Sequence, residues 1–166
     1  MEVKFTRTGQ RRYRVSIEGP DVMSSYMDPA PGYDARLPHD MAHFIVENEL
    51  GIKGGVFGQL AAGGHAGTFV PTDNNKRRKI IRRGERMAKA NQKDAVLSEQ
   101  LVAIAFGLWQ NKDSQIPSVA GITREDIMRV CREFEAASAV WSKLGIGESM
   151  TLVWRARNSR PGRARR

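Results

Sequence analysis

Apolar and polar residues alternate near both ends of the chain, which is the pattern of half-buried β-strands. The alternation covers residues 3–7 and 12–18, and residues 8–10 between them contain a glycine that favours a turn. These segments predict a β-hairpin. Residues 150–154 alternate in the same way and predict a last strand that joins the hairpin. Residues 22–27 predict one further, short strand.

Helical periodicity occupies the middle of the chain. Apolar residues recur every three or four positions after Pro38, after Asp94 and after Thr123, and a basic segment from Asn75 has a thinner apolar face. Thr123 and Asp126 have the spacing of a capping box. The expected helices cover residues 38–50, 75–92, 94–109 and 123–144, with a short apolar element at 56–62. The whole predicts an α+β fold: a small antiparallel sheet packed against a cluster of about four helices.

The length of 166 residues suits one domain. We expect residues 1–157 to form it and the basic residues 158–166 to be a disordered tail. The longest apolar run, Leu101 to Trp109, is much shorter than the roughly 20 residues that a membrane-spanning helix needs. The charged N-terminus has no apolar signal core, so the sequence predicts a cytoplasmic protein without a membrane partner.

Charge changes this picture, because the formal net charge is +9. The excess is concentrated in residues 7–14, 76–89 and 155–166, whereas residues 39–73 are net acidic. A basic surface attracts polyanions, most strongly at low salt. Composition therefore favours nucleic acid or an acidic protein as a partner.

Candidate chemistry is concentrated in the expected helix 38–50. His39, His43 and Glu47 stand at positions i, i+4 and i+8, which share one face of a helix. Neutral imidazole is a common metal ligand, and catalytic zinc sites use three protein ligands and leave one position for water. The spacing predicts a site for Zn²⁺ or another divalent metal.

The third ligand has several candidates. Glu47 lies about 12 Å along the helix axis from His39, because eight residues rise by 1.5 Å each, so both on one ion would be strained. His65 stands in a glycine-rich segment that can fold back over the helix. Glu99 and Glu133, on later helices, are further candidates.

Two resemblances cover this region. Residues 39–43 resemble the zinc-metallopeptidase motif His-Glu-x-x-His, which implies that His39 and His43 bind zinc and that Asp40 is the catalytic general base. The sequence departs from that motif, since Asp40 is one methylene shorter than glutamate. The run from Leu37 to Gly64 also resembles short bacterial proteins of uncharacterised function, in which a Leu-Pro-His-Asp-x-x-His-Phe helix precedes a Gly-Gly-x-Phe-Gly segment. That second resemblance implies a shared fold or site.

Two alternatives remain open at this point. His39 and His43 also lie beside Val46 and Leu50 at the edge of an apolar face, where histidines often serve packing, and Asp40 suits a helix N-terminus. The basic segment offers a different function, a module that binds nucleic acid or another polyanion. Its arginines Arg78, Arg82 and Arg86 stack on one helical face with Lys79 and Arg83 beside them, spaced to meet phosphates.

Overall fold

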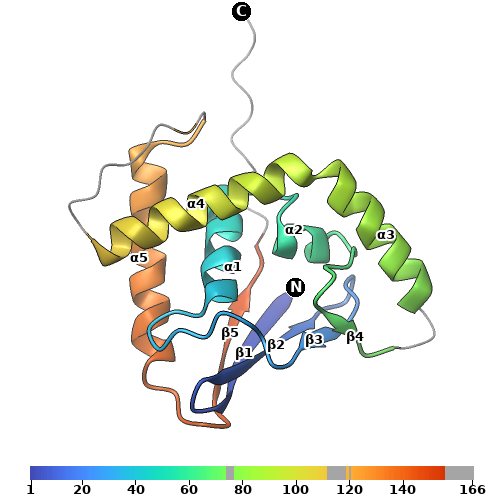
Figure 1. Ribbon diagram of the computed structural model, residues 1–166, viewed down its shortest axis with the longest axis horizontal. Coiled ribbons are helices and arrows are strands. Elements are labelled where there is room, and N and C mark those ends of the chain that lie inside the picture. The colour runs from blue at the N-terminus through green and yellow to red at the C-terminus, as the bar shows by residue number, and fades with distance from the viewer. Residues whose placement is uncertain (74–76, 112–118, 120, 156–166) are drawn as a thin grey trace, which may run out of the picture.

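The computed structural model describes residues 1–73, 77–111, 119 and 121–155. Within them the chain forms one 5-stranded antiparallel sheet in the order β4-β3-β2-β1-β5 (Figure 1). The predicted hairpin, the strand within residues 22–27 and the last strand are confirmed. The edge strand β4 was not predicted, because two residues are too few to show alternation. The strands are β1 (Glu2–Gly9), β2 (Arg12–Glu18), β3 (Ser25–Met27), β4 (Val70–Pro71) and β5 (Ser149–Val153).

The helices cover one face of the sheet (Figure 1). The fold is α+β, as predicted, and the short apolar element expected at residues 56–62 is a helix as well. The capping box is present, since the Asp126 backbone N–H donates to Thr123 Oγ1 and the Thr123 N–H donates to Asp126 Oδ2. The helices are α1 (His39–Leu50), α2 (Val56–Ala61), α3 (Arg77–Ala90), α4 (Gln92–Gln110) and α5 (Arg124–Trp141).

Helix α1 lies at the centre of the core, where it contacts α2, α4 and α5. Phe44 packs edge-on against Phe5 of β1, against Phe57 of α2 and against Trp154 after β5. Because neighbours cover α1 on several sides, its polar residues His43 and Glu47 are buried as well as its apolar ones. Each of these polar groups must therefore find a partner within the protein.

The connector between β3 and α1 (residues 28–38) is hydrogen-bonded to β2 and to α5. The Ala30 N–H donates to the Tyr13 carbonyl at 2.9 Å, and Trp141 Nε1 of α5 donates to the Asp34 carbonyl at 3.1 Å. Gly32 has φ +68°, and a Cβ there would lie 2.7 Å from the Cβ of His39. Glycine is therefore required where the connector passes the first residue of α1.

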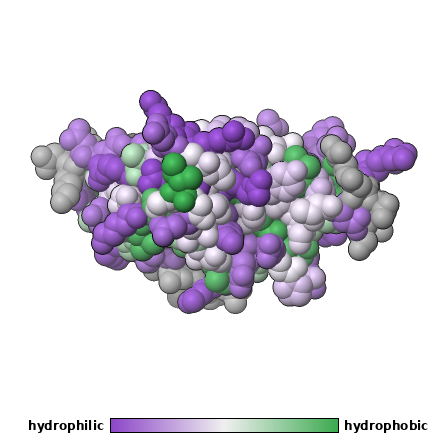
Figure 2. All heavy atoms as spheres, turned by 90° about the horizontal axis from the view of Figure 1, so that it is seen from below, coloured by the Kyte–Doolittle hydropathy of each residue, from purple (hydrophilic) through white to green (hydrophobic). Residues whose placement is uncertain are grey.

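The face of the protein drawn in Figure 2 is predominantly polar, and its apolar areas are small and separate. Within the described residues, no helix is both long and apolar enough to cross a membrane. The tail expected at residues 158–166 lies outside the described part of the chain.

Candidate metal centre

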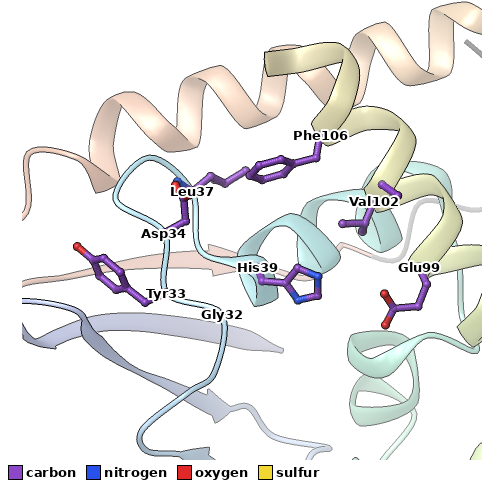
Figure 3. A pocket seen from close by; sticks show the side chains of 9 residues that line it. Gly32, Tyr33, Asp34, Leu37, His39, Glu99, Val102 and Phe106 are labelled. Carbon is purple, nitrogen blue, oxygen red and sulfur yellow. The ribbon is translucent and has the colours of Figure 1, made fainter. Parts of the chain in front are cut away.

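The structure brings His39 and His43 together with Glu99 of α4. One ligand atom from each of the three residues lies within 4.8 Å of the other two. The two imidazole rings are 4.6 Å apart between centroids, and His43 Nε2 lies 3.4 Å from Glu99 Oε2. Glu99 reaches the histidines from a separate helix, α4 (Figure 3).

These distances suit a tetrahedral metal ion after a small adjustment. Zinc bonds of about 2.0–2.1 Å place neighbouring ligand atoms about 3.4 Å apart. The separation of His43 Nε2 and Glu99 Oε2 already has this value, at 3.4 Å. His39 and Glu99 are exposed side chains that can rotate, whereas His43 is buried. The cluster therefore consists of one fixed ligand and two adjustable ones.

A chain of hydrogen bonds fixes the orientation of His43. Its Nδ1 lies 3.0 Å from Ser98 Oγ, and the Ser98 hydroxyl donates to Glu47 Oε1 at 2.9 Å. Because a hydroxyl has one hydrogen, a Ser98 that donates to ionised Glu47 must accept from His43 Nδ1–H. The lone pair of His43 is then on Nε2, the nitrogen that faces Glu99. Such an outer partner commonly orients a metal-binding histidine.

Burial disfavours the protonated form of His43. It lowers the pKa of His43 below its ordinary value, and the repulsion from His39 acts in the same direction, although Glu99 opposes both. A metal ligand must be an unprotonated imidazole. The environment of His43 therefore favours the form that binds metal.

Glu47 has a different role from the predicted one, since it lies outside the cluster. Its carboxylate accepts hydrogen bonds from the backbone N–H groups of Val56, Phe57 and Gly58, at 2.9, 2.8 and 3.1 Å. The side chain is fully buried, and burial raises its pKa to about 7, while these hydrogen bonds act in the opposite direction. Helical rise along α1 moves it away from His39, so it caps α2 instead of facing the histidines.

Close contacts explain the three glycines at the start of α2, and the Glu47 carboxylate explains one of them. A Cβ on Gly55 would lie 2.2 Å from the Glu47 carboxyl carbon. A Cβ on Gly54 would lie 2.6 Å from the Cβ of Asp94, and one on Gly58 would lie 2.5 Å from the Lys53 carbonyl oxygen. Gly55 therefore lets the backbone approach the buried acid, whereas Gly54 and Gly58 leave room for Asp94 and for the Lys53 carbonyl.

His65 is also outside the cluster. The chain turns away from α1 after α2 and brings His65 against α3, where a Cβ on Gly84 would lie 2.3 Å from the His65 carbonyl oxygen. There it lines a cavity of about 550 Å³ with Ile81 and Phe69. The part of the glycine-rich segment that contains His65 does fold back on a helix, but that helix is α3 and not α1.

Asp40 points to the sheet instead of the cluster. Its carboxylate accepts a hydrogen bond from the Tyr13 hydroxyl of β2. Burial raises the pKa of Asp40, and burial together with the Asp40 charge raises the pKa of Tyr13. The observed contact joins β2 to the first turn of α1, and the metallopeptidase role of Asp40 stays a prediction.

A cavity of about 480 Å³ opens beside the cluster. His39 and Glu99 lie on its wall, with Leu37, Val102 and Phe106 as its main apolar side chains (Figure 3). A ligand in the cavity would therefore meet the two adjustable metal ligands.

The predicted basic face lies on α3. Arg78, Arg82 and Arg86 are exposed, and the Arg83 side chain donates to the Ala62 carbonyl at 2.8 Å. The side chain of Lys79 lies outside the described part of the chain. Most of the predicted arginines are thus available to solvent, whereas Arg83 also ties α3 to the end of α2.

Comparisons with known proteins add no family: no family model matches the sequence, and no curated protein or solved structure matches it significantly. The site therefore has to be interpreted from its own geometry. From the sequence, Glu99 was only one of several acids on later helices that could be the third ligand, and Ser98 was not predicted. The sequence feature that could have indicated both residues is their adjacency on α4, where a serine and a glutamate follow one another at the edge of an apolar face.

Proposed function

We propose that the protein binds a divalent transition metal, with zinc as the first choice, through His39, His43 and Glu99. The observation that carries the proposal is the convergence of three ligand atoms within 4.8 Å from two helices. Two imidazoles and one carboxylate are a ligand set of catalytic zinc sites, which keep a fourth position open. Zinc lowers the pKa of a water in that position to about 7.

Two further observations support a working centre. Ser98 links His43 Nδ1 to Glu47, and with Glu47 ionised this leaves the lone pair of His43 on Nε2, which lies 3.4 Å from Glu99 Oε2. The cluster borders a cavity of about 480 Å³, which leaves room for a reactant beside the open position. We therefore propose metal-assisted activation of water, with a small molecule as the reactant.

Zinc binding tests this proposal. Metal-free protein, dialysed against zinc and analysed for metal content, is expected to hold one ion per chain. The double variant His39→Ala, His43→Ala is expected to hold none, and Glu99→Gln is expected to bind at least about 100-fold more weakly in a dye competition, because a neutral amide replaces an anionic ligand. Zinc at 100 times its Kd is expected to add about 2.7 kcal/mol of stability.

Glu133→Gln is the matched control, since Glu133 is an exposed glutamate of α5 outside the cluster. It is expected to bind zinc as the unmodified protein does. A protein that takes up no zinc, or whose Glu99→Gln and Glu133→Gln variants bind it equally well, would contradict the proposal.

A second candidate function rests on α3. This helix contains seven Lys and Arg residues and one Glu, and Arg78, Arg82 and Arg86 are exposed along it. Residues four apart on a helix rise by about 6 Å, which lets successive arginines meet different phosphates. We propose that α3 adds nonspecific binding of nucleic acid.

Salt dependence tests this second function. The triple variant Arg78→Ala, Arg82→Ala, Arg86→Ala is expected to weaken binding to a DNA duplex and to reduce the slope of log K against log salt by up to about 2.7, or 0.9 per lost contact. The exposed arginines Arg124 and Arg132 of α5 supply a control double variant. Equal binding by both variants would exclude α3 as the binding face.

A further inference from the structure

The cavity beside the candidate metal centre has two chemically different ends. His39 and Glu99 form one end, and Tyr33 and Asp34 of the connector lie toward the other (Figure 3). Between them the wall is mainly apolar. Its apolar side chains are Leu37, Val102, Ala103 and Phe106.

Charge limits what can lie at the metal end. A divalent ion held by two neutral imidazoles and one carboxylate has a net charge of about +1. Among the described residues that line the cavity there is no lysine or arginine. A single negative charge therefore balances the site, whereas a phosphate dianion would lack compensation.

The opposite end carries the Asp34 carboxylate and the Tyr33 hydroxyl, which accepts a hydrogen bond from Arg7 Nη2 at 2.9 Å. The Asp34 carboxylate lies there and accepts hydrogen bonds from the backbone N–H groups of Arg36 and Leu37, at 2.7 and 2.9 Å. A negatively charged group is favoured beside the proposed ion at His39 and Glu99, where the net charge is about +1. The rest of the ligand then lies along Leu37, Val102 and Phe106, which favour an apolar body.

Size agrees with this assignment. A cavity of about 480 Å³ lies within the range of small-molecule sites, roughly 300–1,000 Å³. A single aromatic ring or a branched aliphatic chain with a short linker fits this space.

We infer that the cavity between α4 and the connector binds a small monocarboxylate with an aromatic or branched apolar body, whose carboxylate occupies the open metal position. The inference rests on the proposed metal site. It names the class of compound that this site accepts as reactant or product: carboxylates, and the esters or amides that yield them on hydrolysis.

The test uses 3-phenylpropionate and propionate as probes with the full chain. Zinc content is measured first, and calorimetry then compares the probes on zinc-loaded and zinc-free protein. Zinc-loaded protein is expected to bind 3-phenylpropionate at least about tenfold more tightly than propionate, the effect of burying a phenyl ring. Zinc-free protein is expected to lose this binding.

A cavity-filling variant locates the probe. Ala103 is exposed on α4 and lines the cavity, so Ala103→Leu is expected to weaken 3-phenylpropionate binding at least about tenfold by occupying its space. Ala136→Leu is the control, because Ala136 is an exposed helical alanine of α5 outside the cavity lining. Propionate binding is expected to change little in either variant.

The outcomes separate the two proposals. Zinc uptake without a preference for 3-phenylpropionate, or with equal effects of Ala103→Leu and Ala136→Leu, overturns the ligand inference and leaves the metal site standing. Equal binding of 3-phenylpropionate with and without zinc overturns the metal-anchored carboxylate. Absence of zinc uptake overturns both proposals.

Discussion

Replacing Glu47 with alanine is expected to lower the free energy of unfolding by about 4 kcal/mol. The carboxylate accepts from the backbone N–H groups of Val56, Phe57 and Gly58 and from the Ser98 hydroxyl, and it is fully buried. Removing it leaves those donors without an acceptor and creates a cavity. Urea unfolding measures the change, and the corresponding fall in Tm is about 8–16 °C for a chain of this size.

Two comparison variants test whether the loss of stability comes from the hydrogen bonds that the buried carboxylate accepts. Glu47→Gln keeps one acceptor oxygen, so its loss of stability is expected to be intermediate. Glu133→Ala removes an exposed carboxylate of α5 and is expected to change stability by no more than about 0.5 kcal/mol. A loss below about 1 kcal/mol in Glu47→Ala would show that the cap is not a major source of stability.

Gly55→Ala is expected to destabilise the protein by about 3 kcal/mol or more, because overpacking forces neighbouring groups to move. The added Cβ would lie 2.2 Å from the carboxyl carbon of Glu47, a fully buried side chain with little freedom to shift. Thermal unfolding of the single variant measures the loss.

Gly107→Ala is the matched control within α4. A Cβ there meets nothing within 4 Å, and the residue lies inside a helix. Alanine is expected to stabilise this position by about 0.5–1 kcal/mol, opposite in sign to the effect at Gly55. If the two glycine variants had the same sign and size, the close contact at Gly55 would not be the cause.

A double variant isolates that contact. In the Glu47→Ala background the group that Gly55→Ala strikes is absent, so the second substitution is expected to cost at least about 1 kcal/mol less than it does alone. Strict additivity of the two changes would show that the Cβ meets another obstacle.

The elements of the fold that local physics determines were predictable. The hairpin follows from alternation, and α5 begins where Thr123 and Asp126 form the predicted capping box. The left-handed Gly51 ends α1 as a glycine C-cap. Strand β4 was not predictable, because it depends on pairing with β3 and not on its own sequence.

The site was predictable only in part, because one of its three residues is placed by a contact between two helices. The spacing of His39 and His43 is a local property of one helix, and the structure brings them together as expected. The third residue, Glu99, is brought to the histidines by the packing of α4 on α1. The spacing of residues within α1 carries no information about that packing. The sequence also does not show that the backbone N–H groups of residues 56–58 donate to Glu47, which places its carboxylate outside the cluster.

The hydrogen-bonded chain from Glu47 through Ser98 to His43 joins three helices at one point. A disturbance in the backbone turn at α2 can therefore reach the ring of His43, whose Nε2 faces the proposed metal position. Glycine substitutions in residues 54–58 are expected to alter which tautomer His43 adopts, in addition to stability. A change in the conformation of residues 54–58 would then change the metal affinity, although these residues lie outside the metal cluster.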